Sequence, residues 1–232
     1  GNDGPDQGHD REAVRVNFHG FEPWRSRLPS GWGWGQLRRL SEITLGKMLQ
    51  PKPLNREDER RPYLRSANVQ TGHVDDSDVN EMWFSPNEFR KLSLHSGDVV
   101  VTEGGDVGRA AQYSGAPGMY AIQNSVHRIR STGKIDQRFL FYWLTFLKSS
   151  EIYETLVNRS TIAHLTSDKL GQLGIAVPPL ELQRRIAAFL DEESARLDSL
   201  LEESESLVQI ALERRSALIT AAVTGQIDVT TW

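Results

Sequence analysis

The stretch VPPLELQRRIAAFLDEE, from Val177 to Glu193, places two prolines directly before a long run of helix-forming residues. Pro178 and Pro179 hold φ near −65°, and Pro178 disfavours the helical conformation at Val177. Pro179 suits the first turn of a helix. At the far end of the run, Gly225 is the residue type that most often terminates a helix. The sequence therefore predicts a rigid corner followed by one helix with defined ends.

The periodicity from Leu180 to about Val223 is that of a single amphipathic helix, within a predicted helical segment 178–225. A helix of about 43 residues is roughly 65 Å long, which exceeds the ~30–40 Å diameter of a 150-residue domain. Its apolar face therefore needs a second helix, and we expect a spacer that pairs with another helix. The residues of this face are Ile186, Leu190, Leu197, Leu200, Leu201, Leu207, Val208 and Leu218.

Before the corner, residues 21–177 have the mixed texture of a globular domain, in which Gly, Pro, Asn and Asp interrupt short apolar runs. DVVVTEGGDVGRAAQYSG, at 98–115, indicates a strand, a glycine turn and a second strand. GMYAIQNSVHRIRS, at 118–131, indicates two more short strands, although its alternation is poor. Strands are therefore one component of this domain.

Helices are the other component. DQRFLFYWLTFLKSSEIYETLVN, at 136–158, indicates one or two buried helices with Asp136 as the N-cap. TSDKLGQLGIAVPPL, at 166–180, indicates a short helix, a stop at Gly174 and a strand. We expect an α+β domain with a strongly bent mixed sheet.

The composition is that of an ordinary globular chain with an unevenly distributed charge. Hydrophobic residues make up 38% of the 232 residues and charged residues 25%; the absence of cysteine excludes disulfides and thiolate metal sites. The formal net charge is −4. Residues 178–232 hold 10 acidic and 5 basic residues, whereas residues 1–177 hold 21 acidic and 22 basic residues. The globular part can therefore present a local basic face to a phosphate backbone.

The two ends of the chain lack clear periodicity. Residues 1–20 are rich in Gly, Asp, Asn and Gln, which predicts a loose lead-in, and residues 226–232 form a short tail. No apolar run approaches the ~20 residues that span a bilayer, and the start has no signal-peptide pattern. We therefore expect a cytoplasmic protein that binds no membrane. The missing initiator Met suggests a trimmed or excised chain.

Several patterns argue against catalysis. VPPL, at 177–180, lacks the amide or carboxylate and the aromatic residue that amino-methyltransferases place around a Pro-Pro pair. A metal-dependent nuclease site would need a lysine two residues after Glu103, but that position is occupied by Gly105. The acidic run at 75–81 puts Glu81 where a calcium loop requires Gly. We expect no catalytic residue, no metal and no cofactor in this chain.

Four passages together resemble the specificity subunit of type I restriction-modification systems, and they cover about residues 28–229. The most specific passage is TIAHLTSDKLGQLGIAVPPLELQRRIAAFLDEE at 161–193, with its continuation RRSALITAAVTGQIDV at 214–229. The other three are LPSGWGWGQLRRLSEITLGKMLQ at 28–50, YLRSANVQTGHV at 63–74 and LHSGDVVVTEGGDVGRAA at 94–111.

This resemblance implies one target recognition domain followed by one conserved helical region. A whole subunit of that family carries two such pairs, with its two long helices antiparallel as a ruler between the halves of a bipartite DNA site. The family also implies two methyltransferase subunits that bind S-adenosylmethionine, and a separate motor-nuclease subunit. With one domain and one helix, this chain is either a half subunit that pairs with a second copy or an excised half.

Under this resemblance, polar side chains of the domain are candidates for contact with double-stranded DNA. GKMLQPK, at 46–52, predicts a flexible loop with two lysines. Phosphate contacts fix the register of a DNA-binding protein, while Arg, Lys, Asn and Gln read base edges in the major groove. For Tyr63 the alternative is core packing, and for any single Arg it is a solvated surface position. The candidates are Lys47, Gln50, Lys52, Tyr63, Arg65, Asn68, Arg109, Gln123, Asn124, His127, Arg128 and Arg130.

A second hypothesis stays open from the sequence. It is a coiled-coil adaptor whose globular head binds another protein rather than DNA. A steep salt dependence of duplex binding favours the DNA reader, whereas an adaptor shows no such dependence.

Overall fold

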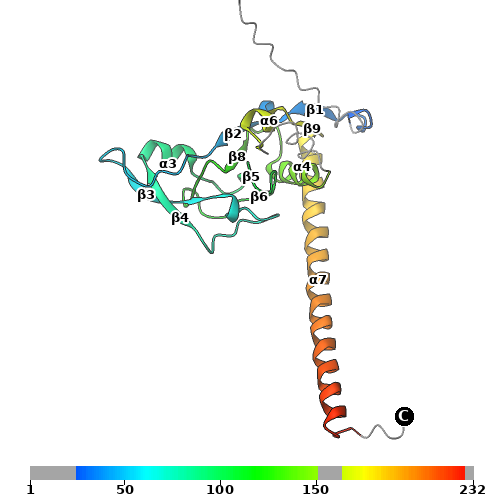
Figure 1. Ribbon diagram of the computed structural model, residues 1–232. Helices are drawn as coiled ribbons and strands as arrows, with labels where there is room; N and C mark the ends of the chain where they lie inside the picture. Colours follow the sequence, from blue (N-terminus) through cyan, green and yellow to red (C-terminus); the bar gives the residue numbers. More distant parts are fainter. Residues whose placement is uncertain (1–24, 151–163, 228–232) are drawn as a thin grey trace, which may run out of the picture.

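In the computed structural model, which describes residues 25–150 and 164–227, the strands form three small sheets rather than one bent sheet (Figure 1). The largest sheet is antiparallel, and β8 and β5 are its two inner strands. In order across this largest sheet, the strands are β2 (Ser41–Leu45), β8 (Val126–Ser131), β5 (Val99–Thr102) and β6 (Ala110–Gln112). The predicted lead-in 1–20 lies outside the described residues.

The other two sheets lie at opposite ends of the domain (Figure 1). At one end, β3 pairs with β4 antiparallel and with β7 parallel, so this sheet is mixed. At the other end, β1 and β9 form an antiparallel pair beside the long helix. These strands are β3 (Glu59–Leu64), β4 (Asn80–Phe84), β7 (Ala121–Ile122), β1 (Gly33–Gln36) and β9 (Gly174–Val177).

Helices complete the domain and confirm the predicted α+β class. The short helix α3 begins with a reciprocal capping box between Ser85 and Glu88. Asp136 is the N-cap of α4, where its carboxylate accepts the N–H groups of Arg138 and Phe139 at 3.0 and 2.9 Å, as predicted. The helical elements are α2 (Leu37–Leu40), a 3-10 turn η2 (Ser66–Asn68), α3 (Pro86–Leu92), α4 (Gln137–Ser149), α6 (Ser167–Gln172) and α7 (Leu180–Val223).

The strand β5 separates two hydrophobic clusters. Side chains alternate between the faces of a strand, so Val99 and Val101 join a cluster formed with α4, α6 and β9. Val100 joins the other cluster, formed with β3, β4 and β7. Because both faces of this sheet are covered, β5 is fully buried and β8 is buried over its first four residues. The predicted strand–turn–strand at 98–115 forms the antiparallel pair β5–β6.

The corner before α7 is held by a buried glutamine. Gln183 Nε2 donates to the Pro178 carbonyl at 2.8 Å, and its Oε1 accepts the Asp136 N–H at 2.7 Å. Pro179 is the N-cap with an extended backbone (φ −51°, ψ 140°), so the helix begins at Leu180, one residue later than the sequence predicts. These bonds tie the helix to the start of α4 and fix its direction.

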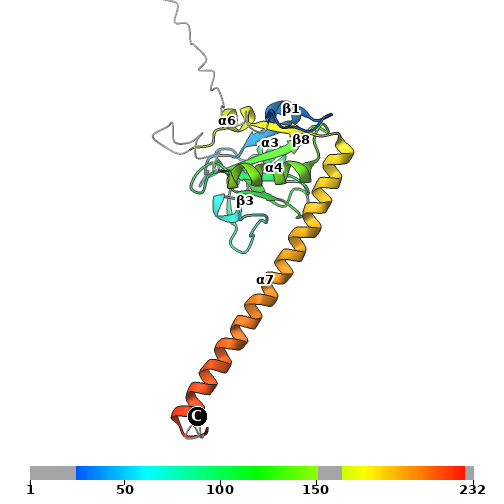
Figure 2. The ribbon, with the colours of Figure 1, turned by 90° about the vertical axis from the view of Figure 1, so that its right-hand side faces the viewer.

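Beyond its first three turns, α7 projects away from the domain (Figure 2). Ile186 packs on the domain core, and Leu190 contributes with Tyr142 and Trp143 to an apolar hollow beside α4. The helix ends at Val223 with Thr224 as its C-cap, and Gly225 has the predicted positive φ of 71°. The remaining six residues of the predicted pairing face are more than half exposed: Leu197, Leu200, Leu201, Leu207, Val208 and Leu218.

No helix within residues 25–150 and 164–227 is long and apolar enough to cross a membrane.

Candidate DNA-binding surface

Several candidate side chains come together where four segments meet at one edge of the domain. The Asn124 N–H donates to the Lys47 carbonyl at 2.9 Å, which joins the loop after β2 to the turn between β7 and β8. The Ser66 N–H and hydroxyl both bond Ser125, at 3.0 and 2.9 Å. Arg109 Nη2 donates to the Ser66 carbonyl at 2.8 Å. We call this set the polar edge: Lys47, Arg65, Ser66, Arg109, Gln123, Asn124 and Ser125.

Within the polar edge, Lys47 points inward. Its ammonium lies 2.5 Å from Glu88 Oε2 and 5.3 Å from the centre of the Phe84 ring, and only 13% of its side chain is exposed. The hydrogen bond from Lys47 lowers the pKa of Glu88. This lysine therefore anchors the loop to α3, which leaves little of its charge for a phosphate.

The sequence predicts a flexible loop at 46–52, but in the structure the loop extends over 46–58 and is held by hydrogen bonds. Gln50 is buried, and its Nε2 donates to the Lys52 carbonyl and to Asp58 Oδ2, both at 3.1 Å. The same carboxylate oxygen accepts the N–H groups of Leu54 and Asn55 at 2.8 and 3.2 Å, and the Leu54 bond is the main reason that the pKa of Asp58 is lowered. The Gln50 side chain thus stabilises the loop from within. Lys52, by contrast, is exposed.

Three further predicted DNA contacts, Tyr63, Asn68 and His127, are buried and bonded or packed within the domain. Tyr63 packs in the hydrophobic cluster of β3 and β4. Asn68 accepts the Arg65 N–H at 3.0 Å and donates to the Asp75 carbonyl at 2.9 Å, so it closes the 65–78 segment. His127 is fully buried, and its Nε2 lies 2.7 Å from the Leu165 carbonyl.

Two arginines of β8 also serve the fold. Arg128 is buried, and its Nη1 donates to the carbonyls of Lys91 and Ser93 at 2.8 and 2.9 Å. Arg130 makes a two-pronged pair with the buried carboxylate of Asp98, at 2.7 and 2.6 Å. The hydrogen-bonding groups of Arg128 therefore face the protein interior. For Arg130, the ion pair engages Nε and Nη2, the N–H groups on one edge of the guanidinium, so these are already occupied by Asp98.

The other candidates keep groups that can reach a ligand. Arg65 pairs with Asp78 at 2.6 Å but remains partly exposed, and Arg109 is also partly exposed. Gln123 Oε1 accepts the Ser125 hydroxyl at 2.5 Å, which leaves its amide NH₂ group. Within the described ranges, no side chain hydrogen-bonds the side-chain amide of Asn124. Together with Lys52, these four remain predicted DNA contacts.

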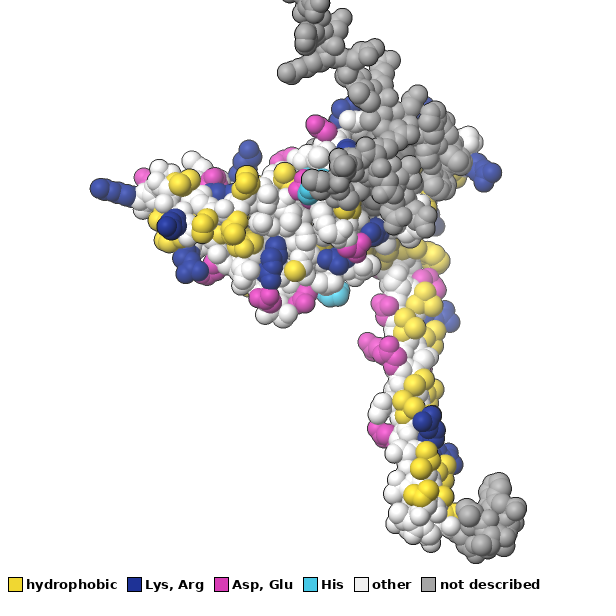
Figure 3. Space-filling model, viewed as in Figure 1, with side chains coloured by type: hydrophobic (Ala, Val, Ile, Leu, Met, Phe, Trp, Pro, Cys, Tyr) yellow, Lys and Arg dark blue, Asp and Glu magenta, His cyan; other side chains and the backbone are white. Residues whose placement is uncertain are grey.

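Around β3 the sequence-based candidates missed a group of exposed charged and apolar side chains. Figure 3 shows dark-blue and yellow side chains close together at the end of the domain farthest from α7. The cations here include Arg56, Arg60 and Arg61, which are exposed. These arginines stand in the run that follows the predicted loop, so their positive charge was a signal that could have extended the candidate set.

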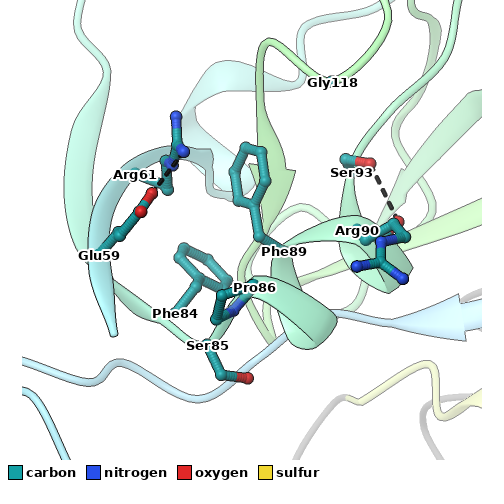
Figure 4. Close-up of a pocket in the computed structure, with 9 residues that line it drawn as sticks. All are labelled: Glu59, Arg61, Phe84, Ser85, Pro86, Phe89, Arg90, Ser93 and Gly118. Carbon is teal, nitrogen blue, oxygen red and sulfur yellow. Dashed lines mark hydrogen bonds and ion pairs between the residues drawn. The ribbon is translucent and has the colours of Figure 1, made fainter. Parts of the chain in front are cut away.

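A hollow of about 360 Å³ lies at the same end, between β3, β4 and α3 (Figure 4). Phe84 and Phe89 supply its apolar wall, and their rings meet edge to face with centroids 5.6 Å apart. Arg61 lies over the Phe89 ring, 5.3 Å from its centre, and pairs with Glu59. The hollow is shallow and open, so we assign it no ligand of its own.

The loop at 46–58 also holds three exposed apolar residues outside the candidate set. Met48, Leu49 and Leu54 are 74%, 57% and 78% exposed. A signal for the loop exists in Gly46 and the Pro-Lys-Pro run at 51–53, since these residues interrupt regular structure. Which side chains face outward depends on the hydrogen bonds described above.

Within the described residues no group of three His, Asp or Glu side chains could hold a metal ion. The chemistry present at the polar edge is hydrogen bonding and positive charge.

Comparison with known proteins identifies the family of this chain. Residues 29–208 match a family model described as the type I restriction modification DNA specificity domain. The chain is 24% identical over 218 residues to the EcoBI type I restriction enzyme specificity subunit of Escherichia coli, which covers 94% of this chain and 43% of that protein. It is 26% identical to the StySPI specificity subunit of Salmonella potsdam, covering 87% of this chain and 44% of that protein.

Solved structures share the fold. One, from a study of the assembly and conformational transition of a type I R-M system, superposes with a TM-score of 0.63 over 84% of this chain and 46% of that chain, at 21% identity. The HsdS subunit from Thermoanaerobacter tengcongensis gives 0.54 over 75% of this chain and 40% of that chain, also at 21% identity. The chain thus spans less than half the length of these relatives. Because the family match extends over both the domain and most of α7, the chain belongs to the type I restriction modification DNA specificity domain family.

Proposed function

We propose that this chain is the DNA-recognition half of a type I specificity subunit and performs no chemistry itself. It reads one half of a bipartite site in double-stranded DNA through the polar edge and the loop at 46–58. Methyltransferase subunits, which supply the S-adenosylmethionine site, dock on it, and the motor-nuclease subunit joins through them. DNA contacts fix the register of the complex on the duplex, and base contacts choose the site.

The observation that carries this proposal is the family match over 29–208, which runs without a break from the domain into the helix. The buried corner at Gln183 supports the same idea, because it holds the two parts at one angle. A reading domain on a rigid rod fits a protein that measures a distance along DNA.

The long helix supplies the spacing. Six residues of its apolar face are more than half exposed in the single chain, and an apolar surface of that length is typical of an interface. Antiparallel pairing with a second copy, or with the other half of a longer chain, places two reading domains at opposite ends of the rod. The distance between half-sites then follows the length of α7.

The test is duplex binding by the chain with its methyltransferase partner. Duplexes are selected from a random pool, and affinity for the selected site is measured between 50 and 200 mM salt. We expect tight, steeply salt-dependent binding by the complex and weak binding by the chain alone, because a half reader makes few base contacts at ~1–3 kcal/mol each.

A matched pair of variants assigns the surface. Arg65→Ala with Asn124→Ala alters the polar edge, whereas Arg184→Ala removes an exposed charge at the root of α7. We expect the first to weaken selection and the second to leave it unchanged. A complex that enriches no sequence and binds duplexes without salt dependence would instead be a protein-binding adaptor.

A further inference from the structure

The tip of the loop at 46–58 presents apolar side chains outward and folds its polar side chains inward. Lys47 is turned toward Glu88 and Gln50 toward Asp58. Met48 and Leu49, which stand between them, are 74% and 57% exposed. We call Met48 and Leu49 the apolar tip. Exposing apolar side chains to water does not stabilise the isolated chain, so this arrangement suits contact with a ligand.

The backbone beneath the apolar tip is fixed. The Lys47 N–H donates to the Ile122 carbonyl at 3.0 Å, and the Trp83 N–H donates to the Gln50 carbonyl at 3.1 Å. A Cβ atom on Gly46 would overlap the backbone of residues 122–123, so only glycine permits this close approach. Both ends of the tip are therefore anchored to strands of the domain, and little conformational entropy remains to be lost on binding.

Two amides stand beside the apolar tip. Lys47 pairs with Gln123 in a parallel bridge, so Met48 and Asn124 are the next residues along neighbouring backbones. The Gln123 amide retains its NH₂ group, as described above. This edge therefore combines amide groups with exposed methyl and methylene groups.

One base pair matches this combination. In the major groove, adenine offers N7 and N6–H₂, which a Gln or Asn side chain can bind in a two-pronged contact. Its partner thymine offers a C5-methyl group, which apolar side chains contact. A G·C pair offers no methyl group in that groove. Positive charge for the flanking phosphates comes from Lys52, which is exposed, and from Arg65, which is partly exposed.

We propose that the apolar tip contacts thymine C5-methyl groups in the major groove while Gln123 or Asn124 binds the adenine of an A·T pair in the same half-site. The inference rests on the proposed function and goes beyond it by naming the base pair and the side chains that select it. Specificity at this position arises from shape and desolvation more than from charge.

The experiment replaces thymine by deoxyuridine, which lacks only the methyl group. The chain with its methyltransferase partner is assayed on its selected duplex, with each thymine of the half-site exchanged singly. We expect one or two exchanges to weaken binding about fourfold, as expected for one methyl group leaving an apolar contact. In the Met48→Ala, Leu49→Ala double variant, thymine and deoxyuridine should bind equally.

Two single variants of the same loop are controls. Leu54→Ala removes an equally exposed leucine farther along the loop, and Lys52→Ala removes a charge. Both should retain the fourfold preference for thymine, and Lys52→Ala should weaken all duplexes alike. Circular dichroism of each variant verifies the fold.

The outcomes are distinct. Specific binding with no deoxyuridine effect, or with an effect that only Leu54→Ala removes, overturns the inference and leaves the proposed function standing. An alanine double variant that binds DNA normally but no longer assembles with the methyltransferase overturns it too, and makes the apolar tip a protein interface. No specific binding by the unaltered complex rejects the proposed function itself.

Discussion

Arg138 on α4 and Asp191 on α7 join the domain to the rod: Arg138 Nε donates to Asp191 Oδ1 at 2.6 Å. The Tyr142 hydroxyl donates to the same oxygen at 2.7 Å. The pair lies two turns beyond the buried Gln183, so the first three turns of α7 are held at two points. These contacts set the angle at which α7 leaves the domain.

We expect Asp191→Asn to lower the stability of the docked helix by about 0.5–1 kcal/mol at pH 7, a value limited by the partial exposure of the pair. Partial burial opposes ionisation of Asp191, yet the bonds from Arg138 and Tyr142 lower its pKa. A lowered pKa gives stability that is present above the ordinary value of 3.8 and is lost as the pH falls through the folded value.

Thermal unfolding of both proteins at pH 7 and near pH 3 provides the measurement. The difference between wild type and Asp191→Asn should shrink at the lower pH. A difference that stays constant or grows in acid would show that the carboxylate charge does not stabilise this joint.

The two lysines of the loop should behave differently. Lys52→Ala should weaken binding to every duplex and reduce the slope of log affinity against log salt by about one unit, as expected for a phosphate contact. Lys47→Ala should leave that slope nearly unchanged and lower stability by about 1 kcal/mol, since it loses Glu88 and the Phe84 ring. Salt titrations of DNA binding, together with denaturation curves, distinguish the two variants. Equal changes in the salt slope would mean that Lys47 also contacts phosphate.

Arg128→Ala should act on the fold and not on base preference. The variant leaves the carbonyls of Lys91 and Ser93 without their buried donor, which we expect to cost about 3 kcal/mol. The midpoint of urea denaturation measures it, and Arg56→Ala, at an exposed site, is the control that should change little. A stable Arg128→Ala protein with relaxed preference at one base would contradict this assignment.

The exposed face of α7 predicts pairing. Leu197→Asp with Leu200→Asp should give monomers in sedimentation, because charges replace apolar side chains that a partner helix would cover. Glu202→Gln with Glu205→Gln is the matched control and should not dissociate the pair. A wild-type chain that stays monomeric at high concentration, with α7 unprotected from hydrogen exchange, would rule out pairing between copies.

Helix length should set the spacing of the DNA site. Inserting seven residues near Ser204 adds two turns, about 10.5 Å, which corresponds to about three base pairs at 3.4 Å per step. Duplexes selected by the longer protein should carry a spacer longer by that amount. An unchanged spacer would mean that α7 does not measure the distance between half-sites.

The sequence by itself determined the elements that depend on neighbouring residues. The Pro178–Pro179 corner, the Asp136 cap, the helix ending before Gly225 and the strand pair around 98–115 all lie where the local pattern predicts them. Caps, prolines and periodicity act over a few residues, so their signals are complete within one short stretch. The start of α7 differs from the prediction by one residue, because Pro179 is its N-cap.

Only the tertiary structure decided which polar side chains face outward. His127 and Arg128 look like surface residues in VHRIR, but β8 lies between β2 and β5 and hydrophobic clusters cover both faces of its sheet. The inward turn of Lys47 and the outward turn of Met48 follow from pairing with residues 122–124, more than seventy positions later in the chain. Burial is a property of contacts between distant segments, and the free energy of hiding or exposing a side chain is set by those contacts rather than by its neighbours in sequence.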